Sequence, residues 1–215
     1  MTYTRLRLRI KYAIVSKYQK ESWESGRIRI FAKDVSPYRL RGFESLRLRR
    51  KNYMNNLIIF GSKYVIFISL LISGIYFLYQ PWDKKKNMLI FGITTVILVG
   101  ILALVMGHYY YDPRPFVVGN FTPLIPHAPD NGFPSDHVLL ASSIAIVLSF
   151  YNRKIALSLW ILTVIIAICR VLSGVHHPID VVGSIVISIL GGSIAYIGIK
   201  EFNKRKNTGA YSKSM

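Results

Sequence analysis

The chain has 215 residues, of which 52% are hydrophobic, and a formal net charge of +18. This length allows one domain with several membrane spans. The single cysteine, Cys169, excludes an internal disulfide framework, and its place in an apolar run indicates a packed residue. The sequence has neither a CxxC nor an HExxH pattern, so it gives no signal of a metal site.

The positive charge is concentrated in residues 1–53, which carry 15 Lys or Arg against 4 acidic residues. Arginine alternates with apolar residues there without a sustained apolar face, and no signal-peptide core is present. Three interpretations stay open: a basic tail on the membrane surface, a nucleic-acid-binding arm, or non-native coding upstream of a start near Met54. We treat residues 1–53 as an extension of doubtful structure, residues 54–203 as a membrane domain and residues 204–215 as a cytoplasmic tail. We expect no nucleic-acid partner, because a membrane accounts more simply for the charge.

Five apolar runs follow the extension. Each approaches the ~20 residues with which a helix crosses ~30 Å of hydrocarbon. Lipid permits only helices or closed barrels, and runs this uniform do not alternate as barrel strands do. The sequence therefore predicts an all-α polytopic membrane bundle of about five transmembrane helices. The runs are Leu57–Tyr79, Met88–Met106, Val138–Tyr151, Ile155–Leu172 and Ile179–Ile199.

The segments between these runs indicate an orientation. Lys84–Lys86, Arg153–Lys154 and the basic residues after Ile199 fall on one side if five spans alternate. Positive residues collect on the cytoplasmic side. We therefore expect the segments Gly107–His137 and Val171–Pro178 at the outer face of the plasma membrane.

The last run contains Ser184, Ser188 and Gly192 at intervals of four residues. Small residues at this spacing let helices approach closely. This pattern favours a packing surface inside one bundle over a dimer interface, and no oligomeric state is predicted.

Three polar clusters lie beside these apolar runs. They are Asp112–Pro115, Phe133–His137, and Arg170 with His176 and Asp180. Ionisable groups near membrane depth are costly and are candidates for function. The predicted topology brings all three clusters to the outer face.

The two arginines suit an anionic phosphoryl group, because each guanidinium offers planar donors to its oxygens. Two prolines stiffen the backbone that presents Arg114. Ser135 falls at the expected start of a helix, where its hydroxyl and free N–H groups would form an anion seat. Arg114, Ser135 and Arg170 are therefore the predicted phosphate-binding residues.

His176 and Asp180 are four residues apart, and Pro178 between them suits the first turn of a helix. Both side chains would lie on one face, where the carboxylate would orient the imidazole and strengthen its other nitrogen as a nucleophile. His137, from another helix start, could protonate a leaving oxygen. The set predicts phosphoryl transfer without a metal.

Each of these residues has an alternative interpretation. Arg114 could be an interfacial anchor, Ser135 only a helix cap, and Asp180 only a partner of the helix dipole. Asp112 and Asp136 could pair with nearby arginines. His177 could replace its neighbour as nucleophile or lie at the lipid interface.

The three clusters resemble, in order, the signature motifs of the type 2 phosphatidic acid phosphatase superfamily. The matching residues are Arg114-Pro115, Pro134-Ser135-Asp136-His137, and Arg170 followed by His176 and Asp180. Within that family, Phe133–His137 and Leu124–Ala128 resemble the bacitracin-resistance type of undecaprenyl-diphosphate phosphatase. The chain departs from the pattern in three places. It has Gly107, next to His108, where a lysine is usual, Asp136 where glycine is usual, and Cys169 where serine precedes the arginine.

The resemblance implies that His176 attacks phosphorus, backed by Asp180, and that His137 protonates the leaving group. Arg114, Ser135 and Arg170 would hold the phosphoryl oxygens, with neither metal nor cofactor. Asp136, His108 and His177 are secondary candidates. The implied substrate is a polyprenyl diphosphate lipid, hydrolysed at the outer membrane face. The alternatives are a phosphatase of phosphatidic acid or phosphatidylglycerol phosphate, and a non-catalytic membrane protein that binds anionic lipid.

Overall fold

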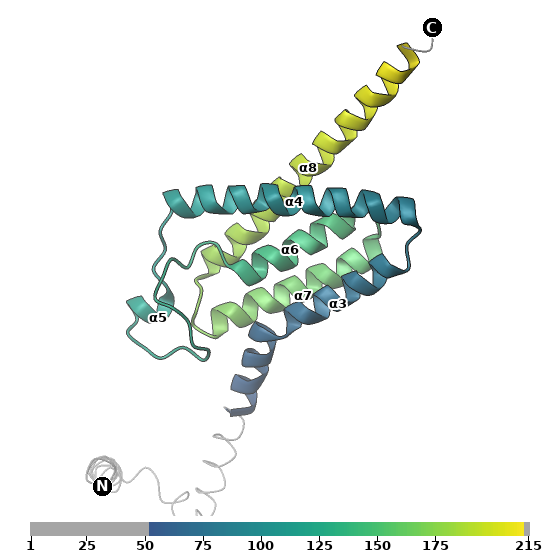
Figure 1. Ribbon diagram of the computed structural model, residues 1–215. Coiled ribbons are helices and arrows are strands. Elements are labelled where there is room, and N and C mark those ends of the chain that lie inside the picture. Colours follow the sequence, from purple (N-terminus) through teal and green to yellow (C-terminus); the bar gives the residue numbers. More distant parts are fainter. Residues whose placement is uncertain (1–51, 213–215) are drawn as a thin grey trace, which may run out of the picture. The chain divides into compact units, whose positions relative to one another are not determined.

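The computed structural model describes residues 52–212, with side chains through residue 205, and this part of the chain is helical (Figure 1). Residues 52–212 contain no strand, only an isolated β-bridge between Pro113 and Asn131. The all-α prediction is confirmed. The predictions for the extension concern residues that lie, apart from Asn52 and Tyr53, outside the described part. The elements are a helix Asn52–Lys63, α3 (Val65–Leu78), α4 (Trp82–Tyr109), α5 (Pro115–Val118), α6 (Asp136–Ser149), α7 (Arg153–Leu172) and α8 (Pro178–Ser212).

Three of these helices, α4, α7 and α8 to Arg205, are long and apolar enough to cross a membrane. The run expected as one first span is two helices, Asn52–Lys63 and α3, bent by 43°, which together make a fourth candidate. The bend falls at Tyr64, directly after the polar interruption Gly61–Lys63. Helix α6 is a shorter apolar helix of 14 residues. The chain is therefore a multi-pass membrane protein, while the count of five spans stays a prediction.

The small residues of α8 pack inside the bundle, as predicted. Ser188 Oγ accepts a hydrogen bond from Ser142 Oγ at 2.8 Å and donates to the Leu139 carbonyl of α6. A Cβ atom at Gly192 would lie 2.8 Å from the side chain of Ile146, so α6 and α8 are in close contact there. Exchanged hydroxyl hydrogen bonds satisfy polar groups that the apolar bundle would otherwise leave unpaired. Ser188 and Gly192 therefore hold α8 against α6 along much of the length of α6.

The two ends of the bundle differ in chemistry. At one end Lys84 Nζ donates to the Tyr76 hydroxyl, which donates to the Tyr151 carbonyl, and Arg153 begins α7 nearby. At the other end α4 and α7 finish, α6 and α8 begin, and the loop with α5 lies over them (Figure 1). The helix order thus carries all three polar clusters to the end opposite the basic residues.

The described part of the predicted tail, residues 204–212, continues α8 as helix. It is not a separate element.

Candidate active site

His176 lies at the centre of the polar end, in the turn between α7 and α8, and its side chain is buried. Its Nε2 atom lies 3.1 Å from Nη2 of Arg170 and 3.4 Å from Nη1 of Arg114. Guanidinium groups only donate, so Nε2 carries the lone pair and Nδ1 carries the proton. The Nδ1 atom faces the Gly132 carbonyl at 2.9 Å and Asp180 Oδ2 at 3.3 Å. In this tautomer the unprotonated Nε2 atom, the candidate nucleophile, faces Arg170 and Arg114.

Electrostatics favour the same neutral form. Burial lowers the pKa of His176, the hydrogen bond to Asp180 opposes this shift, and the charges of Arg170 and Arg114 lower the pKa further. A neutral imidazole keeps its lone pair available for attack.

Arg114 is buried, and its donors are held in several directions. Nε donates to Asp130 at 2.7 Å, Nη1 to the Val175 carbonyl at 3.0 Å and Nη2 to the Asn131 carbonyl at 3.3 Å. This burial does not fit the alternative of an interfacial anchor. Its carboxylate partner is Asp130, not Asp112.

Arg170 is buried on the last turn of α7, beside two histidines. Its Nη2 atom lies 3.2 Å from Nε2 of His127 as well as 3.1 Å from Nε2 of His176. Its Nε atom has no hydrogen-bond partner among the described residues. A buried cation with a free donor is suited to an anionic ligand.

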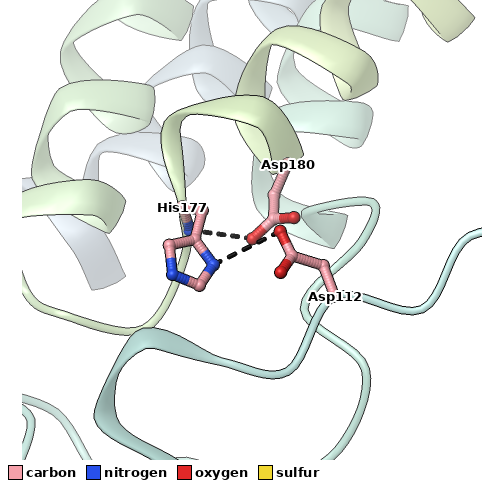
Figure 2. A group of neighbouring side chains, drawn as sticks. All are labelled: Asp112, His177 and Asp180. Carbon is pink, nitrogen blue, oxygen red and sulfur yellow. Dashed lines mark hydrogen bonds and ion pairs between the residues drawn. The ribbon is translucent and has the colours of Figure 1, made fainter. Parts of the chain in front are cut away.

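Asp180 is completely buried in the first turn of α8, behind His176. Its Oδ2 atom also accepts the backbone N–H of His177 at 2.8 Å (Figure 2). The carboxylate therefore holds the backbone of the turn as well as the imidazole, which is more than a helix-dipole role.

Asp112 and His177 lie next to Asp180 (Figure 2). His177 Nδ1 is 3.3 Å from Asp112 Oδ2, so this ring faces the carboxylates and is not placed as the nucleophile. Burial and the neighbouring Asp180 raise the pKa of Asp112. One ligand atom from each of the three residues lies within 4.8 Å of the others, which a cation could bridge. The cluster lies behind His176, which Asp180 contacts directly at 3.3 Å.

Ser135 immediately precedes α6 and is completely buried, but its hydroxyl makes no capping hydrogen bond. The Oγ atom has no partner among the described residues. Instead the backbone N–H of Ser135 donates to Ser184 Oγ at 2.8 Å, and its carbonyl accepts from that hydroxyl at 3.1 Å. The geometry leaves the hydroxyl free for a ligand and does not support the alternative of a helix cap.

His137 is half-buried in the first turn of α6. Arg170, Asp136, His176 and His127 all act on it electrostatically, so it belongs to the same group. Asp136 is exposed and lies near enough to His137 and Arg170 to act on their charge, but among the described residues it makes no hydrogen bond or ion pair with either.

The structure does not bring His108 into this group. Its side chain is exposed, and its ring packs against Tyr109. At Gly107, an added Cβ atom would lie 3.2 Å from the Phe133 carbonyl, so the end of α4 closely contacts the backbone before Ser135.

Sequence reasoning missed Asn131, whose side chain joins the end of α4 to the segments of Asp112 and Phe133. Its Nδ2 atom donates to the carbonyls of Gly107 and Tyr110, and its Oδ1 atom accepts from the backbone N–H groups of Asp112 and Phe133. The position of Asn131 before a glycine indicated only a turn. Asp130 and His127 were also not assigned a role, because their partners lie far along the chain.

Comparisons with known proteins show what the chain is similar to. Residues 88–204 match the model of the PAP2 superfamily. The chain is 36% identical over 147 residues to undecaprenyl-diphosphatase BcrC of Bacillus subtilis (strain 168), covering 66% of this chain and 74% of that protein. It is 28% identical over 144 residues to the bacitracin transport permease protein BcrC of Bacillus licheniformis, covering 66% and 70%.

Among solved structures, LpxE of Aquifex aeolicus aligns with a TM-score of 0.53 and 24% identity, over 78% of this chain and 99% of that one. This likeness shows a shared fold. The match to the family model over more than half of the chain and the 36% identity to the Bacillus subtilis protein show that the chain belongs to the PAP2 superfamily.

Proposed function

We propose that this protein removes the terminal phosphate of undecaprenyl diphosphate and yields undecaprenyl phosphate and inorganic phosphate. One observation carries the reaction type: the Nε2 lone pair of His176 faces two buried guanidiniums, while Nδ1 is held by Gly132 and Asp180. Relatives named as an undecaprenyl-diphosphatase and a bacitracin transport permease support the substrate. The activity would recycle the carrier lipid of cell-wall synthesis and give resistance to bacitracin.

In the first step, Nε2 of His176 attacks the terminal phosphorus. The bond between phosphorus and the bridging oxygen breaks, and its electron pair leaves with undecaprenyl phosphate. His137 donates the proton that this oxygen takes up. Arg114, Arg170 and Ser135 bind the remaining phosphoryl oxygens, where charge is concentrated as the bonds rearrange.

The second step releases phosphate from the phosphohistidine. Water attacks phosphorus as His137, now neutral, takes its proton, and the bond to Nε2 breaks. The electron pair returns to the His176 ring, and Asp180 stabilises the positive ring of the intermediate from the Nδ1 side. Atoms and protons balance over the cycle.

The outer face of the plasma membrane is the proposed location of the reaction. The basic residues at Lys84 and Arg153 lie at the end of the bundle opposite His176, and such residues collect on the cytoplasmic side. Undecaprenyl diphosphate is left outside when glycan is polymerised, so this orientation matches the substrate.

The test is phosphate release by detergent-purified protein from undecaprenyl diphosphate, with phosphatidic acid and phosphatidylglycerol phosphate as competing lipids. We expect the unmodified protein to release phosphate preferentially from the diphosphate. We also expect it to become labelled with substrate phosphate in an acid-labile bond, as a phosphohistidine would be. His176→Ala should show neither phosphate release nor labelling. His108→Ala is a matched control, because this exposed histidine lies outside the site. Phosphate release by His176→Ala that still depends on the other site residues would refute the assignment of His176 as nucleophile. Equal phosphate release from all three lipids would refute the assignment of undecaprenyl diphosphate as the substrate.

A further inference from the structure

Three side chains with metal-ligating atoms meet behind His176: Asp112, His177 and Asp180 (Figure 2). One ligand atom from each residue lies within 4.8 Å of the other two. His177 Nδ1 and Asp112 Oδ2 are 3.3 Å apart. Two ligands of a tetrahedral zinc ion, each bound at about 2.1 Å, lie about 3.4 Å from one another. This pair therefore already has the spacing that such an ion requires, and a small movement of the third side chain completes the set.

The cluster also contains buried polar atoms without a hydrogen-bond partner. Within the described part of the chain, Asp180 Oδ1 and His177 Nδ1 are both buried and both unpaired. The Asp180 side chain is completely buried, and the contact of His177 Nδ1 with Asp112 has the distance of an ion pair without the geometry of a hydrogen bond. Buried polar atoms are nearly always paired with protein, water or an ion. These two atoms indicate that a ligand belongs here.

The charges of the cluster favour a cation as that ligand. Burial and the neighbouring Asp180 raise the pKa of Asp112, since two carboxylates at close range repel one another. A bound cation removes this repulsion. One imidazole and two carboxylates are ligands that zinc accepts, with water in the fourth position.

Backbone contacts hold the ligands in place, and water can reach them. The backbone N–H of Asp112 donates to Asn131 Oδ1 at 2.9 Å, and its carbonyl accepts from the Gly132 N–H at 2.8 Å. Asp180 Oδ2 accepts from the backbone N–H of His177 at 2.8 Å. The His177 side chain is 34% exposed, so a hydrated ion can approach it from outside the membrane-spanning helices.

We propose that Asp112, His177 and Asp180 bind a divalent transition-metal ion, of which Zn²⁺ fits the ligands best, and that this ion inhibits the enzyme through Asp180. The inhibition rests on the proposed function, because it acts on the phosphohistidine formed at His176. The ion takes no part in the reaction steps themselves. No sequence pattern indicated the site, because Asp112 lies far along the chain from its two partners.

The inhibition follows from the position of Asp180 between the ion and the nucleophile. Asp180 Oδ2 lies 3.3 Å from Nδ1 of His176, where its negative charge stabilises the positive ring of the intermediate. A zinc ion bound to the same carboxylate neutralises this charge. We therefore expect saturating Zn²⁺ to lower kcat by about 10- to 100-fold, and a chelator to restore it.

The first measurement is Zn²⁺ binding by calorimetry, without lipid substrate, on chelator-treated protein that carries no histidine tag. We expect one ion for each chain. His177→Ala keeps the backbone N–H that Asp180 accepts, and Asp112→Asn keeps the shape of the side chain. Each should lower the Zn²⁺ affinity at least about 10-fold, because even an outer partner of a metal ligand contributes roughly 10- to 100-fold. His108→Ala is the matched control, and thermal melting of each variant checks its folding.

The second measurement is kcat with and without Zn²⁺, each variant compared with its own metal-free rate. Zn²⁺ should inhibit the unmodified protein and His108→Ala but not His177→Ala. Binding that is unaffected in both His177→Ala and Asp112→Asn, or lost only in His137→Ala, would mean an adventitious ion only and overturn the site. Zn²⁺ bound at the site with unaltered kcat would overturn the inhibition. If the protein releases no phosphate from the lipid, the proposed function fails, while the binding series still decides the metal site.

Discussion

The Nε2 atom of His176 lies 3.1 Å from Nη2 of Arg170, although the two residues belong to different segments separated by the end of α7. The cation of one residue is directed at the lone pair of the other. A bound phosphoryl group would place its phosphorus at Nε2 and its oxygens at the guanidinium. The two residues therefore define one binding position for nucleophile and anion.

Arg170→Lys should lower kcat/KM by about 10- to 100-fold, because one ammonium replaces a planar group that serves the phosphoryl oxygens and both histidines. Steady-state phosphate release measures this change. Lysine keeps the positive charge. Activity equal to that of the unmodified protein would therefore show that charge alone suffices for phosphate binding, and that the planar arrangement of guanidinium donors is not needed.

Asp180→Asn should lower kcat by about 10- to 100-fold, through loss of the negative charge that stabilises the cationic phosphohistidine. The loss should be smaller than for His176→Ala, because the Gly132 carbonyl at 2.9 Å still holds the proton on Nδ1. Rapid-quench measurement of the phosphoenzyme gives the rate of the first step. An unaltered rate of its formation and breakdown would contradict the role of Asp180.

Ser135→Ala separates a helix cap from a substrate contact. Loss of a cap destabilises a protein by about 0.5–2 kcal/mol. Here the hydroxyl makes no such bond, so we expect an unchanged melting temperature together with a roughly 10-fold lower affinity for orthovanadate. A lower melting temperature with unchanged vanadate affinity would restore the cap interpretation.

Asp130→Ala should have a small effect, less than about 10-fold in kcat/KM. Its carboxylate is 60% exposed, and exposed ion pairs contribute about 0–1 kcal/mol. Arg114 also keeps its bonds to the carbonyls of Val175 and Asn131. Arg114→Ala is the variant for comparison, and we expect it to lower kcat/KM far more than Asp130→Ala does. Similar losses in the two variants would mean that Asp130 acts in the reaction itself.

The pH profile should reflect the lowered pKa of His176. Burial, Arg170 and Arg114 favour the neutral ring, with Asp180 opposing, and only the neutral ring is nucleophilic. Activity should therefore persist below pH 6.5, the ordinary value, and fall only as pH drops through the lower pKa. The kcat/KM profile, corrected for the separately measured ionisation of the diphosphate, tests this. An acid limb centred above pH 6.5 would contradict it.

The sequence predicted which residues would lie together because its motifs are local. Four-residue spacing predicted that His176 and Asp180 would lie on one helical face. Their side chains do meet, but His176 lies in the turn before α8, which begins at Pro178 as expected. Topology then predicted that the clusters of Arg114 and Ser135 would meet them at one end of the bundle.

Other features depend on tertiary contacts that no local pattern encodes. Asp130 pairs with an arginine 16 residues away, and His127 with one 43 residues away. The bend at Tyr64 interrupts an apolar run whose composition fits a single span. His108 was considered because it neighbours the missing lysine position, but the helix turns it toward the surface.

The shortness of α6 determines where this helix meets α8. At about 1.5 Å per residue, α6 covers about 21 Å and α7 about 30 Å, and the tight turn at Asn152 joins the end of α6 to the start of α7. Ser135 correspondingly meets Ser184, six residues into α8, rather than the start of that helix. Ser135 therefore approaches the site from deeper in the bundle than Arg170, which lies on the last turn of α7. A phosphoryl group bound by both residues would be held between these two levels, while the hydrocarbon chain of the proposed carrier lipid stays in the bilayer.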